Sequence, residues 1–319
     1  MSKKSILEVK DLKVYYKTVA GDAKVVDGVS LEVNEGEIFG IAGESGCGKS
    51  TLVEGIFRII KPPGYIVGGE VLFRGINLLK LEESELREIR WKRIAYIPQG
   101  AMSSLNPVLK VEEQVVDAIL DHSDVSRDEA VELAKKVLTE LGLPEEVLNM
   151  YPHELSGGMK QRVIIASAYA LRPELIIADE PVTALDVVSL REVMQTLAEL
   201  RDKYGVTIIF VAHDMAVHAE VDERIAIMYA GKLVEIGDIY KIFEDPLHPY
   251  TRGLIESIPS IKEKRIIKGI PGIAPSPLNW PPGCRFHPRC PHANEMCKSK
   301  IPELREVEQG RFVACHLYG

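Results

Sequence analysis

The sequence has no long apolar run and no excess of positive charge. Apolar stretches such as residues 163–171 and 206–212 are far shorter than the roughly 18–20 residues that a membrane-spanning helix needs. Lys and Arg number 39 against 47 Asp and Glu, so the formal net charge is −8 and no global positive field favours a nucleic acid. Charged residues within positions 3–11 interrupt any apolar core of an export signal. We therefore expect a chain that is neither exported nor inserted in a membrane, and that binds no nucleic acid.

The sequence also lacks internal repeats, low-complexity blocks and long heptad runs. With 319 residues and 46% hydrophobic content, it can bury one large core or two modest ones. Apolar stretches at residues 175–178 and 206–211, each preceded by a plausible helix, predict an α/β core with parallel strands. Helical spacing of Leu, Ile and Val in residues 81–93 and 126–142 predicts helices. We expect two or more helices to be inserted before residue 156, with a helical subdomain at about residues 100–170.

A glycine-rich segment at residues 43–50 matches the phosphate-loop pattern G-x-x-x-x-G-K-[ST]. Residues 38–42 before it are apolar and predict a strand, and a helix is predicted to follow. Glycines let successive backbone N–H groups point at phosphate oxygens, helped by the positive end of that helix. Lys49 is expected to reach the β- and γ-phosphates, and Ser50 to hold Mg²⁺. The residues predicted to bind ATP here are Gly43, Glu44, Ser45, Gly46, Cys47, Gly48, Lys49, Ser50 and Thr51.

The adenine base needs a stacking surface, which an early tyrosine can supply. Tyr16 is one candidate and Tyr15 is its competitor. From the residues alone, either tyrosine equally suits a half-buried position in a strand.

Two acids, Asp179 and Glu180, end the apolar stretch at residues 175–178. At the carboxyl end of a strand beside a phosphate loop, the first can bind Mg²⁺ and the second can polarise the attacking water. His213 could hydrogen-bond the γ-phosphate, and Gln99 could contact Mg²⁺ or water. Taken singly, each of these residues also suits a structural role. The phosphate loop in the same chain favours the catalytic interpretation.

The segment at residues 155–162, Leu-Ser-Gly-Gly-Met-Lys-Gln-Arg, resembles the signature of ATP-binding cassette (ABC) proteins. Its order relative to the phosphate loop, Gln99, Asp179 and His213 also resembles theirs. The resemblance covers residues of roughly 6–245 and implies a P-loop ATPase fold. It implies a head-to-tail dimer with two ATP molecules, each between one subunit's phosphate loop and the other's signature.

By position, the resemblance implies a role for each residue of the site. Tyr16 is implied as the adenine-stacking aromatic, Glu180 as the general base and His213 as the switch histidine. Mg²⁺ is implied to bind Ser50, Gln99 and Asp179. The residues implied to contact the ATP of the opposite subunit are Ser156, Gly157, Gly158 and Asp186.

Beyond residue 245 prolines crowd the sequence, which predicts a separate irregular module. We expect an ATP-binding domain at residues 1–245 and an extension at residues 246–319. Residues 246–251 and 272–290 resemble the C-terminal extension of ABC ATPases from oligopeptide and dipeptide importers. This resemblance implies a peripheral ATPase on the cytoplasmic face of the membrane. Its implied partners are two permeases, an external solute-binding protein and a second, non-identical cassette.

Three other readings stay open from the sequence. Some relatives in the same group carry nickel or oligosaccharides, so the extension does not fix the cargo. A soluble ABC protein without permeases usually joins two cassettes or carries long coiled coils, whereas this chain has one phosphate loop. A regulatory module that binds ATP without turnover would lack the base, yet Glu180 is present.

The sequence has only five cysteines, and four of them crowd its last 36 residues. Their spacing is C-x₅-C-x₆-C-x₁₇-C, which is unlike the C-x₂-C pairs of common zinc sites. Some members of the importer group hold a [4Fe–4S] cluster at such residues, and the resemblance implies one here. Zinc, disulfides and free thiols are the alternatives. The implied ligands are Cys284, Cys290, Cys297 and Cys315.

Overall fold

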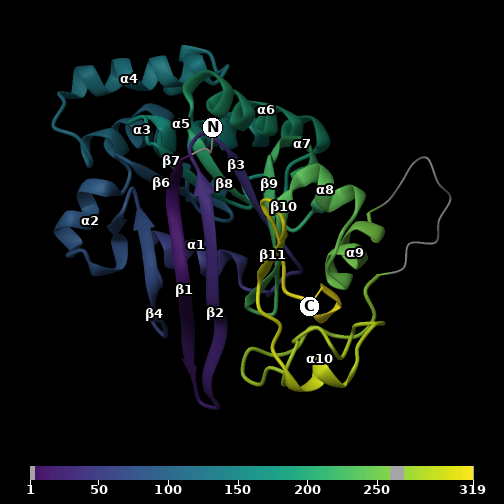
Figure 1. Ribbon diagram of the computed structural model, residues 1–319. Coiled ribbons are helices and arrows are strands. Elements are labelled where there is room, and N and C mark those ends of the chain that lie inside the picture. Colours follow the sequence, from purple (N-terminus) through teal and green to yellow (C-terminus); the bar gives the residue numbers. More distant parts are fainter. Residues whose placement is uncertain (1–3, 259–268, 319) are drawn as a thin grey trace. The chain divides into compact units, whose positions relative to one another are not determined.

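The computed structural model describes residues 4–258 and 269–318. The chain divides into two compact units. Unit 1 comprises Met1–Asn34, Phe39–Leu79 and Ala212–Gly319, and unit 2 comprises Glu35–Ile38 and Lys80–Val211. Both units combine helices with strands (Figure 1). The predicted α/β class is therefore confirmed.

An antiparallel sheet of four strands forms one layer of unit 1. In spatial order it comprises β2 (Gly21–Asn34), β1 (Ser5–Thr18), β4 (Gly64–Phe73) and β5 (Ile76–Asn77). Leu7, Leu12 and Val14 on β1 are fully buried, because apolar residues of these strands face the core. Helix α1 (Lys49–Phe57) contacts β1 and β2.

A second set of strands in unit 1 surrounds an aromatic core. Its order is β3 (Ile38–Ala42), β9 (Arg224–Tyr229), β10 (Lys232–Asp238), β12 (Arg311–Val313) and β11 (Arg305–Glu308). Only the β3–β9 pair is parallel among these. The rings of Tyr229, Tyr250 and Phe286 lie 4.6–5.4 Å apart in this core. The helices of this part are α7 (Met215–Val221), α8 (Ile239–Glu244), α9 (Pro249–Glu256) and α10 (Glu295–Ser299).

Unit 2 contains three parallel strands. These are β6 (Ile94–Ile97), β7 (Leu175–Asp179) and β8 (Thr207–Val211), with β7 in the middle. Every residue of these strands is buried, as expected for parallel strands covered on both faces. The strands predicted from the apolar stretches at residues 175–178 and 206–211 are confirmed.

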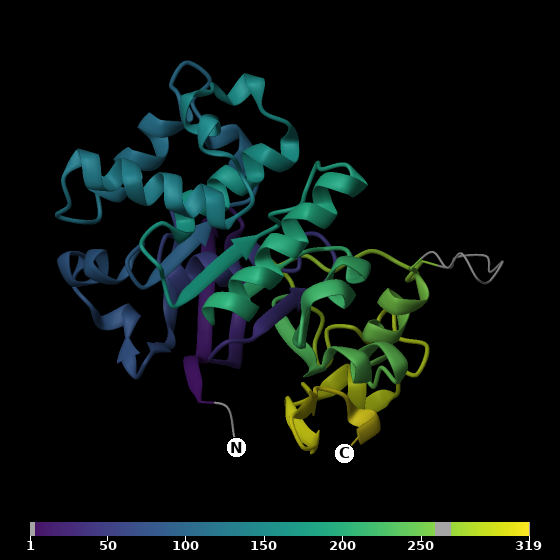
Figure 2. The ribbon, with the colours of Figure 1, turned by 90° about the horizontal axis from the view of Figure 1, so that it is seen from above.

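Most of the remaining chain in unit 2 is helical (Figure 2). Its helices are α2 (Glu83–Ile89), α3 (Val111–Leu120), α4 (Arg127–Glu140), α5 (Gly157–Tyr169) and α6 (Val187–Tyr204). Ser126 and Glu129 form a capping box at the start of α4, where each side chain accepts a hydrogen bond from the other residue's backbone N–H. The helices predicted in residues 81–93 and 126–142 are thus confirmed as α2 and α4.

Helix α6 is the longest of the described helices, with 18 residues. Its C-cap is Gly205, whose φ of 69° is the left-handed conformation that glycine adopts at little cost. Charged residues are spread along α6, and it is not apolar enough to span a bilayer. The same holds for every other helix in the described part of the chain.

The C-terminal region, residues 269–318, is mostly turns and bends. It contributes α10, a short 3-10 helix (His316–Tyr318) and the β11–β12 hairpin, whose strand β12 pairs with β10. All three arginines that are buried in the described residues lie in this region, and each pairs with an acid outside it. The pairs are Arg285 with Asp27, Arg289 with Glu44 and Arg311 with Glu235.

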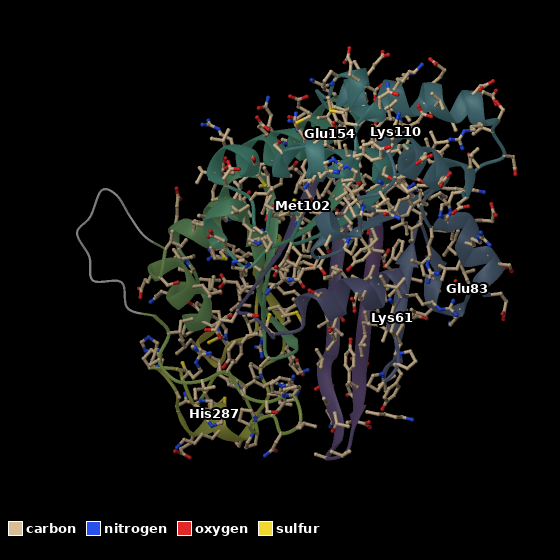
Figure 3. All side chains as sticks on the ribbon, turned by 180° about the vertical axis from the view of Figure 1, so that it is seen from behind. Lys61, Glu83, Met102, Lys110, Glu154 and His287 are labelled. Atoms are coloured by element: carbon tan, nitrogen blue, oxygen red, sulfur yellow. The ribbon has the colours of Figure 1, made fainter. Side chains whose placement is uncertain are left out.

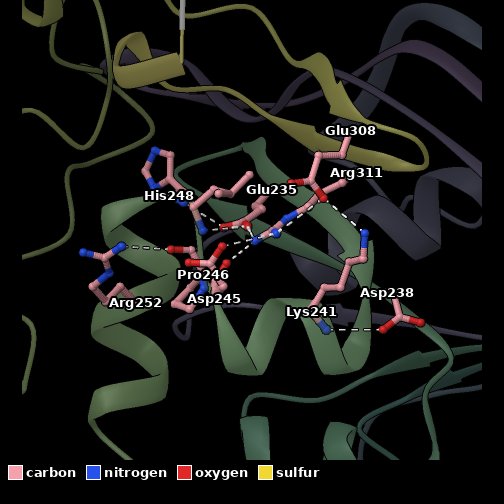
Figure 4. A network of polar contacts seen from close by, with 10 residues as sticks. Glu235, Asp238, Lys241, Asp245, Pro246, His248, Arg252, Glu308 and Arg311 are labelled. Carbon is pink, nitrogen blue, oxygen red and sulfur yellow. Dashed lines mark hydrogen bonds and ion pairs between the residues drawn. The ribbon is translucent and has the colours of Figure 1, made fainter.

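Figure 4 shows the third of these pairs. Arg311 is 3% exposed and Glu235 is fully buried. Glu235 also accepts hydrogen bonds from the backbone N–H groups of Leu247 and His248, both at 2.9 Å. The Arg311 guanidinium further donates to the carbonyl of Asp245. The carboxylate and the cation therefore bind each other and the backbone where the chain leaves α8.

Candidate nucleotide-binding site

The phosphate loop of unit 1 follows β3 directly, and α1 begins at Lys49. Gly43, Gly46 and Gly48 have φ values of 154°, 77° and 109°, which side chains rarely tolerate. A Cβ on Gly43 would lie 2.2 Å from the Met228 carbonyl oxygen, so this position has no room for one. The glycine spacing of the motif is therefore required by the loop's own geometry. Backbone N–H groups of a glycine-rich loop at the start of a nine-residue helix suit a phosphate group.

Lys49 is the cation of this loop. It is 5% exposed, and its Nζ donates to the carbonyl oxygens of Gly43 and Glu44 at 2.7 and 3.2 Å. The ammonium is thus held inside the loop, where it can transfer those hydrogen bonds to phosphate oxygens. Cys47 is buried, and burial raises the pKa of its thiol. It fills space beside Lys49 and Gly43, as expected for a small side chain at a variable position of the motif.

The two candidate tyrosines on β1 are distinguished by their partners. Tyr15 donates a hydrogen bond to Asp27 at 2.7 Å, and its ring packs edge-on against Tyr65 at 6.5 Å. Successive residues of a strand face opposite sides, so Tyr16 points away from this contact. Tyr16 is half-buried and pairs across the strands with Gly64. Tyr15 is therefore occupied structurally, which leaves Tyr16 as the candidate for adenine.

The two acids at the end of β7, Asp179 and Glu180, lie in unit 2 with Gln99. Asp179 is 1% exposed and accepts a hydrogen bond from the Tyr96 hydroxyl at 3.2 Å. Gln99 donates from its Nε2 to Glu180 at 2.8 Å, and the Thr183 hydroxyl donates to the same carboxylate oxygen at 3.0 Å. The structure thus brings Gln99 and Glu180 together, as the prediction of joint action at one site requires.

The backbone of Glu180 is strained in a way that suits a functional residue. Its φ is 48°, uncommon for a residue other than glycine, and its N–H donates to Val211 O at 2.9 Å. The left-handed turn directs the side chain toward Gln99. Sequence reasoning missed the contacts of Tyr96 and Thr183, because residue order alone does not show which hydroxyls meet these carboxylates.

The signature segment in unit 2 begins α5. The hydroxyl of Ser156 accepts from Met159 N at 3.2 Å and caps the helix, as predicted. A Cβ on Gly158 would meet Ser189 at 3.0 Å, so this glycine permits close packing of α5 on the start of α6. Asp186 caps α6, because its carboxylate accepts from the N–H groups of Val188 and Ser189 at 3.0 Å. Hydrogen bonds from Ser189 lower the pKa of Asp186.

The segment after Gln99 also reaches the start of α5. Met102, labelled in Figure 3, lies in a short 3-10 helix (Ala101–Ser104), and its Sδ is 4.0 Å from where Gly157 would carry a Cβ. Helix α5 contacts this 3-10 helix. Within unit 2, the segment that follows Gln99 therefore packs against the start of the signature helix.

His213 is exposed on unit 1, immediately before α7. A second histidine, His218, supports the backbone at this place and was missed from the sequence. His218 is fully buried, with Nδ1 at 2.5 Å from Asp222 and Nε2 at 3.2 Å from the Ala212 carbonyl oxygen. Burial raises the pKa of Asp222 to about 6. The His-Asp spacing of four residues on a helix was the available sequence signal.

Known proteins resemble the chain over nearly its whole length. Residues 26–183 match the family described as ABC transporter. The dipeptide transport ATP-binding protein DppD of Caldanaerobacter subterraneus subsp. tengcongensis is 47% identical, over 98% of this chain and 97% of that protein. The oligopeptide transport ATP-binding protein OppD of Escherichia coli is 41% identical, over 98% and 93%. The chain belongs to the ABC transporter ATP-binding proteins.

A solved structure supports the same conclusion for the fold. The dimeric structure of MJ0796, a bacterial ABC transporter cassette, matches with a TM-score of 0.65 and 32% identity, over 73% of this chain and 98% of that one. The ABC ATPase fold is thus confirmed. Residues 234–297 of this ABC protein further match the family described as oligopeptide/dipeptide transporter, C-terminal region. The resemblance stated from the sequence is confirmed on both counts.

The four clustered cysteines of this ABC protein are free thiols in unit 1. The backbone N–H of Cys284 donates to the carbonyl of Cys297 at 2.8 Å, which ties the segment at Cys284 to helix α10. Burial, together with repulsion from the other three thiols, raises the pKa of Cys284 to about 11. Burial likewise raises the pKa values of Cys290 and Cys315. The four sulfurs are therefore close enough to interact electrostatically.

No group of three or more His, Cys, Asp or Glu side chains among the described residues is arranged to hold a metal ion. The comparisons name no iron–sulfur cluster either. His287, labelled in Figure 3, makes a 2.9 Å contact from its Nδ1 to the Cys284 carbonyl and shapes the turn between Cys284 and Cys290. The predicted cluster ligands thus share one region, and the cluster itself stays a prediction.

Proposed function

We propose that this chain is the ATP-hydrolysing subunit of an ABC importer that takes up di- and oligopeptides. The observation that carries the ATPase part is the Gln99–Glu180 contact after β7 in a chain that also has an intact phosphate loop. The peptide part rests on the DppD and OppD relatives and on the match of residues 234–297.

Each predicted site residue keeps its role in this proposal. The loop at residues 43–51 binds the phosphates of ATP, and Tyr16 stacks on adenine. Ser50, Gln99 and Asp179 hold Mg²⁺, which when bound neutralises charge on the β- and γ-phosphates. Hard oxygen ligands of this kind suit Mg²⁺.

Hydrolysis is assigned to two further side chains. Glu180 orients the attacking water and accepts its proton, and Gln99 and Thr183 hold its carboxylate by hydrogen bonds. His213 contacts the γ-phosphate as the switch histidine.

A second cassette completes the proposed enzyme. The capped start of α5, with Ser156, Gly157 and Gly158, attracts anions through its free N–H groups and contacts the ATP of the opposite subunit together with Asp186. We expect the partner to be a non-identical paralogue. ATP closes the pair, and hydrolysis lets it separate, because only the triphosphate bridges both faces strongly.

The subunit acts on the cytoplasmic face of the membrane beneath two permeases, which receive cargo from an external solute-binding protein. We propose that residues 100–170 form the helical subdomain that passes motion to a permease. We propose residues 246–319 as a separate functional extension. Nickel or oligosaccharides are the alternative cargoes, and a soluble ABC ATPase without permeases is the less favoured alternative.

We also propose a [4Fe–4S] cluster on Cys284, Cys290, Cys297 and Cys315, with zinc as the alternative. The donors suit a metal centre that binds thiolates: burial raises the pKa values of Cys284, Cys290 and Cys315, and a bound metal centre would supply the positive charge that these thiols need to ionise. When bound, the cluster would cross-link a region with few buried apolar residues.

The test of the cluster is the iron, zinc and acid-labile sulfide content of anaerobically purified protein. About four irons and four sulfides per chain, with an absorption band that bleaches in dithionite, would support it. Zinc alone, or no metal, would exclude it and leave the ATPase assignment intact.

The test of the function is ATP turnover by the purified chain together with its copurification with membrane permeases. We expect Mg²⁺-dependent release of phosphate and capture of two integral membrane proteins. Turnover without permeases would favour the soluble alternative, and binding without turnover would favour a regulatory module.

A further inference from the structure

Arg289 of the C-terminal region makes a two-pronged contact with the phosphate loop. Its two terminal nitrogens donate to the two carboxylate oxygens of Glu44 at 2.7 and 2.9 Å. The Arg289 side chain is 5% exposed and that of Glu44 is 28% exposed. Glu44 is the first variable residue of the loop, immediately after Gly43. A residue 245 positions away in sequence is thus bound to the loop that is predicted to bind the phosphates of ATP.

The guanidinium is fixed on its other side as well. Its Nε donates to the Pro271 carbonyl at 2.8 Å, and Nη2 donates to the Ile270 carbonyl at 3.3 Å. The rings of Tyr229 and Phe286 lie 5.7 and 6.0 Å from its central carbon. Since a planar guanidinium with all these contacts has little freedom, it holds the Glu44 carboxylate in one place.

The peptide groups of Glu44 are hydrogen-bonded on both sides. Its backbone N–H donates to the hydroxyl of Tyr250 at 2.8 Å, and Tyr250 is fully buried. Its carbonyl accepts from the ammonium of Lys49 at 3.2 Å. Both Tyr250 and Arg289 come from beyond residue 245, so that part of the chain fixes the side chain and the N–H of Glu44. These contacts fix the position of the Glu44 carbonyl that accepts from the Lys49 ammonium.

An acid in a phosphate loop is otherwise unfavourable, because its charge repels the triphosphate. The paired guanidinium neutralises that charge and, through the fork, also fixes the conformation of the loop. Fixing the backbone of one residue corresponds to about a tenfold change in an equilibrium constant.

We propose that Arg289 is a positioning residue for ATP: through Glu44 it neutralises and orders the phosphate loop, so the C-terminal region supports nucleotide affinity. The proposal rests on ATP binding at this loop, which is the proposed function. Arg289 acts only through Glu44 and has no contact with the reacting atoms.

The experiment is a double-mutant cycle on the full-length chain, with the dissociation constant of Mg²⁺ and a fluorescent ATP analogue as readout. Arg289→Met should weaken binding of the analogue about tenfold, because the Glu44 carboxylate loses its paired cation and the phosphate loop loses the contact that orders it. In a Glu44→Ala background the same substitution should change affinity less than about twofold, because its partner is gone. Arg289→Lys keeps the charge but loses the fork and should lie between wild type and Arg289→Met.

Arg311→Met is the matched control, since it breaks the other buried Arg–Glu pair of unit 1 shown in Figure 4. It should lower the melting temperature while leaving the dissociation constant unchanged. Unchanged affinity in Arg289→Met, or an equal loss in both Glu44 backgrounds, would overturn the proposal. If Arg289→Met does not fold, Arg289→Lys in both backgrounds decides in the same way. Failure of the wild-type chain to bind the analogue would instead contradict the proposed function.

Discussion

The ATP-handling segments and the C-terminal region are stabilised by different means. Strands β3, β7 and β8 consist entirely of buried residues, and their loops rely on glycine geometry. The C-terminal region buries few apolar side chains but contributes all three buried arginines of the described residues. Burial of apolar strands gives a framework that tolerates a strained residue such as Glu180, whereas the C-terminal region depends on paired charges. Substitutions should therefore affect turnover in the first and stability in the second.

The largest effect should come from the general base. Glu180→Gln should lower ATP turnover by about 10²- to 10⁴-fold, because the proton acceptor is lost while the hydrogen bonds of Gln99 and Thr183 can persist. Phosphate release at saturating ATP measures this, and ATP affinity should be retained. Glu199→Gln on the exposed face of α6 is the matched control and should leave turnover unchanged. If Glu180→Gln kept turnover within about threefold of wild type, Glu180 would not be the general base.

Breaking a buried ion pair in the C-terminal region should lower stability rather than turnover. Arg311→Met leaves Glu235 charged and buried, which should cost about 3–5 kcal/mol of unfolding free energy. Urea denaturation followed by circular dichroism measures the loss. Lys203→Met, which breaks the exposed pair with Glu199, should cost less than about 1 kcal/mol. Equal costs for the two variants would show that the C-terminal region does not depend on its buried ion pairs.

Acid should destabilise the folded chain through His248, the buried histidine shown in Figure 4. Burial lowers the pKa of His248 from 6.5 to about 3, and its Nδ1 accepts from Tyr250 N at 3.0 Å. The folded state therefore binds fewer protons than the unfolded state between these pH values. The free energy of unfolding is therefore unaffected by protonation of His248 above pH 6.5. It decreases as the pH falls from 6.5 toward 3, by up to about 1.4 kcal/mol per pH unit.

The check is the urea midpoint of the wild type and of His248→Asn between pH 7 and 4.5. Asparagine retains an oxygen to cap α9 but does not titrate. We expect the wild-type curve to fall more steeply with acid than that of the variant. Parallel curves would show that His248 makes no contribution to acid sensitivity.

The smallest effect should separate the two tyrosines of β1. Tyr16→Ala should weaken ATP binding about fivefold, because one aromatic–base contact contributes about 1 kcal/mol. Tyr15→Phe, which removes only the hydrogen bond to Asp27, should leave affinity unchanged. Equilibrium binding of the fluorescent ATP analogue measures both. The reverse ranking would assign adenine to Tyr15.

Local patterns predicted the regular part of the fold. The phosphate loop follows from glycine spacing because backbone geometry demands it, and β7 and β8 follow from apolar runs that only a buried strand needs. The Ser156 cap is local too. By contrast, Tyr96 and the three buried arginines meet partners far away in sequence. No periodicity encodes such pairs, because they depend on how loops pack.

The most direct test of the account is ATP turnover by the chain assembled with its permeases and second cassette in lipid vesicles, with the solute-binding protein and peptides added. We predict that peptides raise the hydrolysis rate, and that Glu180→Gln abolishes the stimulated rate. An ATPase that assembles with no permease, or whose rate no peptide alters in a complete assembly, would contradict the central claim.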